Sequence, residues 1–367
     1  NSTPAANAPA RSTRSSGAAP TTTPTTASGS AASSSTAHAF ALFQQKQYDA
    51  ALKEALQIAA ADPKNSDAWK VAGFAEYSLN KFEDAAEHLR RALDLQLAAG
   101  ESDAPTADEL AQAYIRTQKY DLALPLLVGA TTRANAAPDS TMLYFRGLAE
   151  ANTGKAAEAE RSFNEALKVD PKNKYALLQL GQLAYGRGDY KSAINMLNRA
   201  TLADATLAPA WELLTTAYLN RAKSETGAAA DADYLAAVRA SDSLARLRND
   251  EQTAALQGQA LFFAKQYVRA AAALERAAAS PKAPDATFFL LGYSYFQAKN
   301  YPKAIPALER AAAKTPDNAD LYRLLGFSYE TLKQYAKALT AYEKGLQLAP
   351  TDAYFKESAD RVRQFAK

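Results

Sequence analysis

Side chains that commonly perform catalysis or bind metals are scarce in this sequence. The 367 residues include no cysteine and two histidines, His38 and His88, which stand apart. The absence of cysteine excludes disulfides, thiolate metal sites and cysteine nucleophiles within this chain. We expect His38 to be partly buried on one helix and His88 to face solvent on another, so no metal or cofactor is predicted.

Acidic residues and one glycine-rich turn also lack the context of a catalytic or nucleotide site. Glu83 and Asp84 precede a predicted helix, where carboxylates stabilise the positive end of the helix dipole. Gly186-Arg187-Gly188 resembles part of a phosphate loop, but it lies between two predicted helices and does not follow a strand. The sequence therefore predicts a protein that is not an enzyme.

The charge balance and hydropathy exclude two further classes of partner. The formal net charge is +3, from 42 basic and 39 acidic residues, whereas nucleic-acid binders usually carry a basic surplus on one face. No uncharged run of predominantly apolar residues approaches the roughly 18 residues that a membrane-spanning helix needs. We therefore expect a mostly helical protein with no nucleic-acid partner and no membrane-spanning segment.

Residues 1–36 differ in composition from the rest of the chain. They are almost entirely Ala, Ser, Thr, Pro and Gly, with Arg11 and Arg14 as the charged exceptions, which predicts a disordered tail. Ser/Thr-rich segments with proline are also typical of O-glycosylated stalks. Because the sequence begins with Asn1, a removed export signal is one explanation, and we expect an extracellular, cell-surface or periplasmic location, with the cytoplasm as the alternative. The candidate glycosylation sites are Thr21, Thr22, Thr23, Thr25 and Thr26.

The remainder repeats every 34 residues, as successive small anchors show. Gly147 precedes Gly181 by 34 residues, and the same interval separates Gly258, Gly292 and Gly326. A bulky residue and another small one follow on the same helical face, which predicts two closely packed helices in each repeat. Each anchor is followed twelve residues later by an alanine: Ala85 after Gly73, then Ala159, Ala193, Ala270, Ala304 and Ala338.

This pattern resembles the tetratricopeptide repeat family. Leu291-Gly292-Tyr293-Ser294-Tyr295 is similar to the family's first helix, Asp189-Tyr190-Lys191-Ser192-Ala193 to its second helix, and Asp62-Pro63 to the proline that ends a repeat. The resemblance implies an all-α fold, a right-handed α-solenoid of about nine helix-turn-helix repeats with a C-terminal capping helix. We expect a tail over 1–36, the array over 37–352 and the cap over 353–367.

Several departures from the repeat predict local differences. The sixth repeat is stretched around residues 222–233 and has Thr215 at its anchor, so its helices should extend past their neighbours. Pro125 and Pro306 fall inside second helices, where each should kink or delay the helix, and we assign them no function. The predicted cap carries an apolar stripe of Phe355, Ala359, Val362 and Ala366.

The resemblance implies a concave groove lined by the first helix of each repeat. The lining residues lie three residues before the anchor, one residue after it and four residues after it. An aromatic, weakly charged groove would suit extended peptides rich in Ala, Pro and hydroxyl groups. The alternative, of equal weight for any single ring, is that these aromatics pack between adjacent first helices. The positions are Lys70, Phe74, Tyr77, Tyr144, Leu148, Leu178, Gln182, Tyr185, Phe289, Tyr293, Phe296, Arg323, Phe327 and Glu330.

Two functional hypotheses follow. The favoured one is a non-enzymatic scaffold, exported or on the cell surface, that binds protein or peptide partners in the groove. The alternative is a structural protein that forms filaments, in which the tail of one copy, with or without glycans, docks on the next copy. A chaperone cofactor is disfavoured, because Phe74 and Glu109 stand where the family's carboxylate clamp has amide or basic residues.

Overall fold

The protein is all-helical in the part of the chain that its computed structural model describes, residues 30–134, 137 and 139–366. These residues form nineteen α-helices and no strand. The candidate glycosylation sites lie outside the described residues. The chain divides into two compact units, Asn1–Ala176 and Leu177–Lys367, with the boundary inside α9. None of the described helices is both long and apolar enough to cross a membrane.

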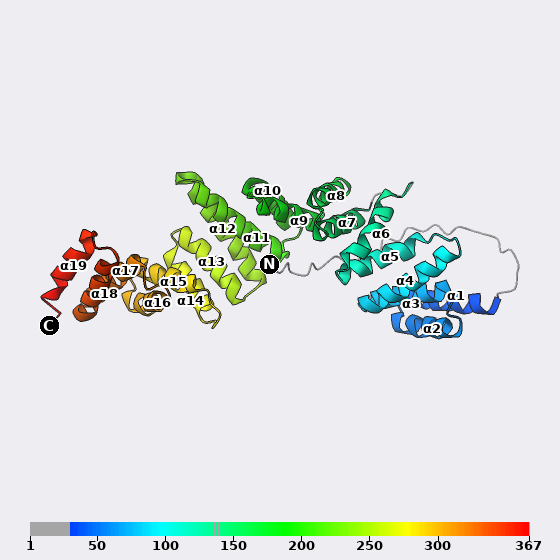
Figure 1. Ribbon diagram of the computed structural model, residues 1–367, viewed down its shortest axis with the longest axis horizontal. Coiled ribbons are helices and arrows are strands. Elements are labelled where there is room, and N and C mark those ends of the chain that lie inside the picture. The colour runs from blue at the N-terminus through cyan, green and yellow to red at the C-terminus, as the bar shows by residue number, and fades with distance from the viewer. Residues whose placement is uncertain (1–29, 135–136, 138, 367) are drawn as a thin grey trace. The chain divides into compact units, whose positions relative to one another are not determined.

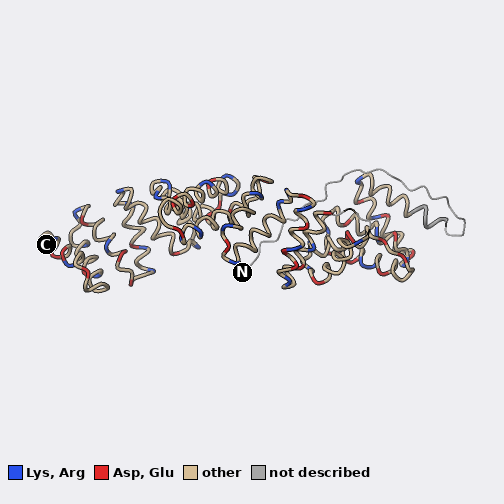
Figure 2. The backbone as a smooth tube through the Cα atoms, turned by 90° about the horizontal axis from the view of Figure 1, so that it is seen from above, with Lys and Arg blue, Asp and Glu red and all other residues tan. Residues whose placement is uncertain are grey.

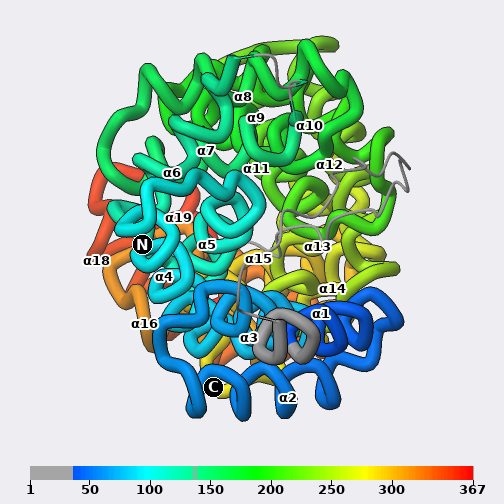
Figure 3. Tube along the Cα trace, turned by 90° about the vertical axis from the view of Figure 1, so that its right-hand side faces the viewer, coloured from blue at the N-terminus to red at the C-terminus, as the bar shows by residue number. Residues whose placement is uncertain are grey.

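Helices of unit 1 follow one another as hairpins joined by short turns (Figure 1). The odd-numbered member of each pair is the first helix of a repeat and the even-numbered member is the second helix. In Figure 3, α1, α2 and α3 lie side by side, so one hairpin packs on the first helix of the next. The helices are α1 (Ser30–Gln44), α2 (Tyr48–Ala61), α3 (Ser66–Ser78), α4 (Phe82–Ala98), α5 (Ala104–Arg116), α6 (Tyr120–Thr132), α7 (Ser140–Asn152) and α8 (Ala156–Val169).

Unit 2 continues the same alternation and ends with an unpaired helix. The described helices thus make nine hairpins and one further helix, which agrees with the predicted number of repeats and the predicted cap. They are α9 (Lys174–Gly186), α10 (Tyr190–Ala203), α11 (Ala208–Ser224), α12 (Gly227–Leu247), α13 (Glu251–Phe263), α14 (Tyr267–Ala278), α15 (Asp285–Gln297), α16 (Tyr301–Lys314), α17 (Ala319–Thr331), α18 (Tyr335–Leu348) and α19 (Ala353–Arg363).

Turns within the hairpins share one backbone geometry. In eight repeats the residue two before the second helix has a positive φ, between 57° and 80°. The next N–H donates back to a carbonyl five residues earlier, as from Lys81 to Glu76 and from Asn300 to Tyr295, both at 2.9 Å. This bond satisfies a carbonyl at the end of the first helix and reverses the chain. The left-handed residues are Lys46, Asn80, Gln118, Gly154, Gly188, Lys265, Lys299 and Lys333.

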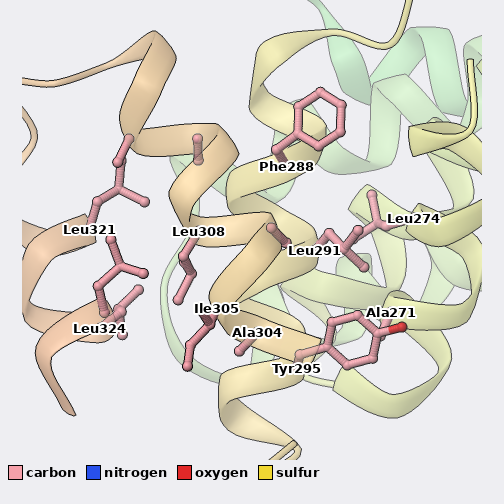
Figure 4. Packing of buried hydrophobic residues seen from close by; sticks show 14 of the residues in the cluster. Ala271, Leu274, Phe288, Leu291, Tyr295, Ala304, Ile305, Leu308, Leu321 and Leu324 are labelled. Carbon is pink, nitrogen blue, oxygen red and sulfur yellow. The ribbon is translucent and has the colours of Figure 1, made fainter. Parts of the chain in front are cut away.

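Small anchors allow the two helices of a hairpin to pack closely. A Cβ atom placed on Gly292 would lie 2.6 Å from Leu308 Cγ, and one on Gly147 would lie 2.6 Å from Phe163 Cε1. The alanines that follow the glycine anchors by twelve residues are all fully buried. Figure 4 shows Leu308 and Ala304 in this core beside Leu291. The predicted pattern of small and bulky residues is confirmed.

The sixth repeat is lengthened, as predicted. Helices α11 and α12 contain 17 and 21 residues, whereas α13 contains 13 and α14 contains 12. Arg221 and Asp233 form an ion pair at 2.5 Å where the two helices face each other. Thr215 is fully buried at the anchor, and its hydroxyl donates to the carbonyl of Trp211 at 2.8 Å, so the core tolerates this replacement of glycine.

The two prolines do not delay their helices. Pro125 lies inside α6 and Pro306 inside α16, five residues after each helix begins. Only one intrahelical bond is lost at each site, because proline lacks an N–H. Of the two predicted effects, the delayed start is not observed, and the kink stays a prediction.

The last helix covers α18. Phe355, Ala359 and Val362 are each at most 1% exposed, as expected for the predicted apolar stripe. Arg323 reaches from α17 to Asp352, the N-cap residue of α19, at 2.6 Å. These contacts fix the beginning and the apolar face of α19 against the final repeat.

Candidate functional site

Aromatic rings meet at the turn of many repeats. The ring four residues after the anchor contacts the ring that begins the second helix. Such a partner is present for three predicted groove residues, Tyr77, Tyr185 and Phe296. The partner rings were not predicted from the sequence. The sequence contains the pattern that indicates these pairs, two aromatic residues five positions apart. The pairs and their centroid distances are Phe43–Tyr48 (5.6 Å), Tyr77–Phe82 (5.2 Å), Tyr185–Tyr190 (5.5 Å), Phe262–Tyr267 (5.9 Å) and Phe296–Tyr301 (5.7 Å).

In the seventh and eighth repeats these pairs join with three further rings, one of them from the ninth repeat, into one continuous set of contacts, here named the aromatic run. Tyr293 lies 5.3 Å from Phe262 of the preceding repeat and 5.9 Å from Phe289. Phe296 lies 5.5 Å from Phe327 of the following repeat. The aromatic run consists of Phe262, Tyr267, Phe289, Tyr293, Phe296, Tyr301 and Phe327, contributed by α13 to α17.

Rings of the aromatic run are packed together and still reach solvent. Phe289, Tyr293 and Phe296 are half-buried and rest on the core of unit 2. Phe327 is 39% exposed. Burial raises the pKa of the Tyr267 hydroxyl above its ordinary value. Packing between adjacent first helices is confirmed, and exposed ring surface remains available.

Arg323, which was predicted to line the groove, contacts the last helix. Besides its ion pair with Asp352, its guanidinium lies 4.8 Å from the Tyr354 ring centroid and 5.0 Å from that of Phe355. These contacts hold the cation against α19. Arg323 therefore acts in attaching the last helix in this structure.

Predicted groove residues of unit 1 form a smaller and more polar cluster. Lys70 Nζ lies 2.6 Å from Asp103 Oδ2 and 5.8 Å from the Phe74 ring centroid. Burial opposes ionisation of Asp103, but hydrogen bonds from Lys70 and Thr106 keep the pKa of that carboxyl below its usual value. Arg116 Nε donates to the Tyr77 hydroxyl at 3.4 Å.

Tyr144 is a correction to the predicted groove. It is 1% exposed, and its ring lies 6.0 Å from Phe163 and 5.7 Å from Tyr175. Leu148 and Leu178 are also buried. These side chains belong to the core and cannot contact a ligand in the groove.

Two predicted groove positions near the start of unit 2 are half-buried. Gln182 and Tyr185 both lie on α9. The Asn220 side-chain amide donates to the Tyr185 hydroxyl at 2.7 Å, and burial raises the pKa of that hydroxyl. Tyr185 is thus held in place by the neighbouring repeat.

Both histidine predictions are wrong. His88 is half-buried, and its Nδ1 lies 2.7 Å from Oε2 of Glu76, a core position only 3% exposed. This hydrogen bond raises the pKa of His88. His38 has a side chain 65% exposed and pairs with Glu54 at 2.8 Å. The buried carboxylate of Glu76 is the reason that His88 turns inward, and the described residues show no cluster that could hold a metal ion.

A separate hollow of about 430 Å³ lies between α14 and α16. Phe288 and Pro306 are among the residues that line it, and the Arg310 guanidinium lies 3.9 Å from the Phe288 ring centroid. At its edge, Lys303 Nζ lies 3.1 Å from Glu275. Each cation here already contacts a partner from the same unit.

Family comparisons agree with this repeated geometry. A family model described as a tetratricopeptide repeat matches residues 36–104, 109–174 and 289–353, more than half of the chain, and a second model with that description matches 153–217. The chain belongs to the tetratricopeptide repeat family. A model described as anaphase-promoting complex, cyclosome, subunit 3 matches residues 231–311. Membership places the chain in a family whose fold supports protein-interaction scaffolds.

Several solved tetratricopeptide structures are similar at low identity. YrrB, described as a TPR protein with an unusual peptide-binding site, is 17% identical and covers 55% of this chain and 99% of its own, with a TM-score of 0.46. The C-terminal part of a repeat protein from Cytophaga hutchinsonii is 17% identical and covers 78% and 97%, with a TM-score of 0.45. MamA from Desulfovibrio magneticus RS-1 is 18% identical and covers 49% and 99%, with a TM-score of 0.42. No curated protein sequence matches the chain.

Proposed function

We propose that this tetratricopeptide protein is a non-enzymatic scaffold that binds extended peptide segments along the aromatic run. The observation that carries the proposal is the contact of rings from three successive repeats, with Phe327 39% exposed at one end. Rigid aromatic surfaces bind ligands with little loss of side-chain entropy. A peptide laid across these repeats would contact several rings at once.

The chemistry of the aromatic run favours an uncharged peptide. Its seven side chains are Phe or Tyr, and Arg323, a predicted groove residue of the last repeat, is paired with Asp352. Proline-rich segments in an extended conformation dock on aromatic surfaces because little conformational entropy is lost. Tyrosine hydroxyls of Tyr293 and Tyr301 would add hydrogen bonds to the peptide backbone.

A fluorescent peptide tests this proposal. The probe is a twelve-residue peptide with the sequence of residues 18–29, AAPTTTPTTASG, titrated with protein lacking residues 1–29 so that the chain's own segment does not compete. We expect Phe327→Ala to weaken binding at least about tenfold, because aromatic anchors dominate such recognition. Fluorescence anisotropy gives the dissociation constant.

Leu202→Ala is the matched control, because Leu202 is 88% exposed on α10, outside the aromatic run. It should bind like the parent protein, while circular dichroism shows that both variants remain folded. A second probe with every threonine replaced by glutamate should bind more weakly. Equal affinity of the Phe327→Ala and Leu202→Ala variants would contradict the site.

The self-assembly alternative is supported by one feature, the match between the uncharged aromatic run and the Ala-, Pro- and Thr-rich composition of residues 1–29. In that case the intact chain forms larger species, and removal of residues 1–29 abolishes them in light scattering. Glycosylation of the tail threonines and a location at the cell surface stay predictions, which mass spectrometry and cell fractionation test.

A further inference from the structure

Helix α6 differs from the other second helices in its outer surface. It carries one charged residue, Asp121, whereas every other second helix in the described residues carries at least two. Leu122 is 48% exposed and Val128 is 36% exposed. Pro125 and Gly129 are exposed as well. These four residues form an uncharged face on one side of the helix, here named the α6 face.

The folding of a single chain does not explain the presence of Pro125 and Gly129 in this helix. A Cβ atom added to Gly129 would meet nothing within 4 Å, so the fold has room for an alanine there. Glycine inside a helix is less favourable than alanine by about 1 kcal/mol. Pro125 removes a helical hydrogen bond and projects its ring to solvent. Both residues are unfavourable in the isolated helix and suited to close approach from outside.

Charges at the two ends of α6 indicate which partner fits. Asp121 lies in the first turn, and Arg133 is the C-cap residue at the opposite end. Arg133 is 37% exposed and forms an ion pair with Asp108 at 2.8 Å, which leaves further guanidinium donors for a second acceptor. A partner complementary to this face is an apolar helix with a basic residue beside Asp121 and an acidic residue beside Arg133. Antiparallel α6 of a second copy meets that requirement.

We propose that the α6 face pairs with the α6 face of a second copy around a two-fold axis at the level of Leu127. A residue a given number of positions before Leu127 in one copy then lies beside the residue the same number of positions after Leu127 in the second copy. Pro125 lies beside Gly129 of the second copy, so a ring enters the space that a missing side chain leaves. Asp121 lies beside Arg133 of the second copy, and the symmetry repeats both contacts.

One helix face is smaller than a standard protein interface, so the dimer should be weak and concentration-dependent. The proposal is independent of peptide binding, because the α6 face lies in unit 1 and the aromatic run lies in unit 2. Failure of either proposal leaves the other standing.

Analytical ultracentrifugation of the full chain between about 1 µM and 1 mM tests the pairing, since weak dimers have dissociation constants in this range. We expect Val128→Glu to remove the dimer, because it places a charge in the apolar face. Leu202→Glu is the matched control, with a more exposed leucine on another second helix, and should dimerise like the parent. Circular dichroism confirms folding of each variant.

A charge exchange tests the register of the two helices. Asp121→Arg and Arg133→Asp should each weaken dimerisation about tenfold, and the double variant should restore it, because opposite charges face each other again. Monomers over the whole concentration range would overturn the proposal. So would a dimer unaffected by Val128→Glu, a double variant weaker than both single ones, or self-association that disappears when residues 1–29 are removed.

Discussion

Several buried polar side chains of the array have partners on the neighbouring helix, whereas Tyr144, Gln96 and Ser294 each have a buried side-chain atom without one among the described residues. Glu150 accepts a hydrogen bond from Ser162 at 2.6 Å, and the Tyr342 hydroxyl donates to Glu330 at 2.7 Å. The Tyr144 hydroxyl has no hydrogen-bond partner among the described residues, although its ring is 1% exposed. Burial accordingly raises the pKa of this hydroxyl. An unsatisfied buried hydroxyl lowers stability because it loses its bonds to water.

Replacement of this hydroxyl should therefore stabilise the protein. We expect Tyr144→Phe to raise the free energy of unfolding by about 1 kcal/mol, whereas Tyr342→Phe should lower it by about 1 kcal/mol because its bond to Glu330 is lost. Urea denaturation followed by circular dichroism measures both. A loss of stability in both variants would show that the Tyr144 hydroxyl has a hydrogen-bond partner in solution.

At the scale of the helix pair, glycine has two different roles. Packing requires glycine at position 292, because a Cβ atom on Gly292 would lie 3.0 Å from the backbone nitrogen of Leu308 and 2.6 Å from its side chain. Gly129 has open space around it. The same substitution should consequently have opposite effects at the two positions.

Gly292→Ala should lower the free energy of unfolding by about 2 kcal/mol, because overpacking against Leu308 outweighs the better helix propensity of alanine. Gly129→Ala should raise it by up to about 1 kcal/mol. Thermal unfolding at a few micromolar, where a weak dimer dissociates, compares the two. Equal destabilisation would mean that Gly129 is also required for packing.

Helix positions were predictable from sequence because small residues recur at a fixed interval, and close packing requires them at that interval. The direction of single side chains was less predictable. Offsets from the anchor place Tyr144 and Phe327 at comparable sides of their helices, yet Tyr144 is buried against Phe163 and Tyr175 while Phe327 is exposed. That outcome depends on the shapes of neighbouring side chains, which the repeat pattern does not specify.

His88 shows the same limit for charged groups. Its inward orientation follows from Glu76, a buried residue three positions after the anchor Gly73. The same position holds the buried Glu150 in the fourth repeat and the apolar Leu261 in the seventh, so the repeat pattern does not specify its charge. The turn aromatics, by contrast, could have been found from their five-residue spacing. Contacts that depend on spacing within one repeat could thus be predicted from the sequence, whereas contacts between individual side chains of different helices could not.

At the scale of the whole molecule, each repeat depends on its neighbours. Lys and Arg are interspersed with Asp and Glu along the backbone of the described helices (Figure 2). Helices contact those next to them in sequence, as in other repeat proteins, where stability is the sum of each repeat and its interfaces. A change at one end should therefore act mainly on the adjacent repeats.

Removal of residues 353–367 tests this locality. The deletion exposes the face of α18 that Phe355 covers, and it removes the ion pairs of Arg361 with Glu330 at 2.8 Å and of Arg363 with Glu343 at 3.1 Å. We expect faster amide hydrogen exchange in α17 and α18 and unchanged exchange in α3 and α4, because local opening depends on nearby buried contacts. Mass spectrometry of peptides from the intact and truncated proteins measures both regions. Arg363→Gln, which removes two exposed ion pairs and leaves α19 in place, should change exchange little. Equal acceleration throughout the truncated chain would show that the repeats unfold as one cooperative unit.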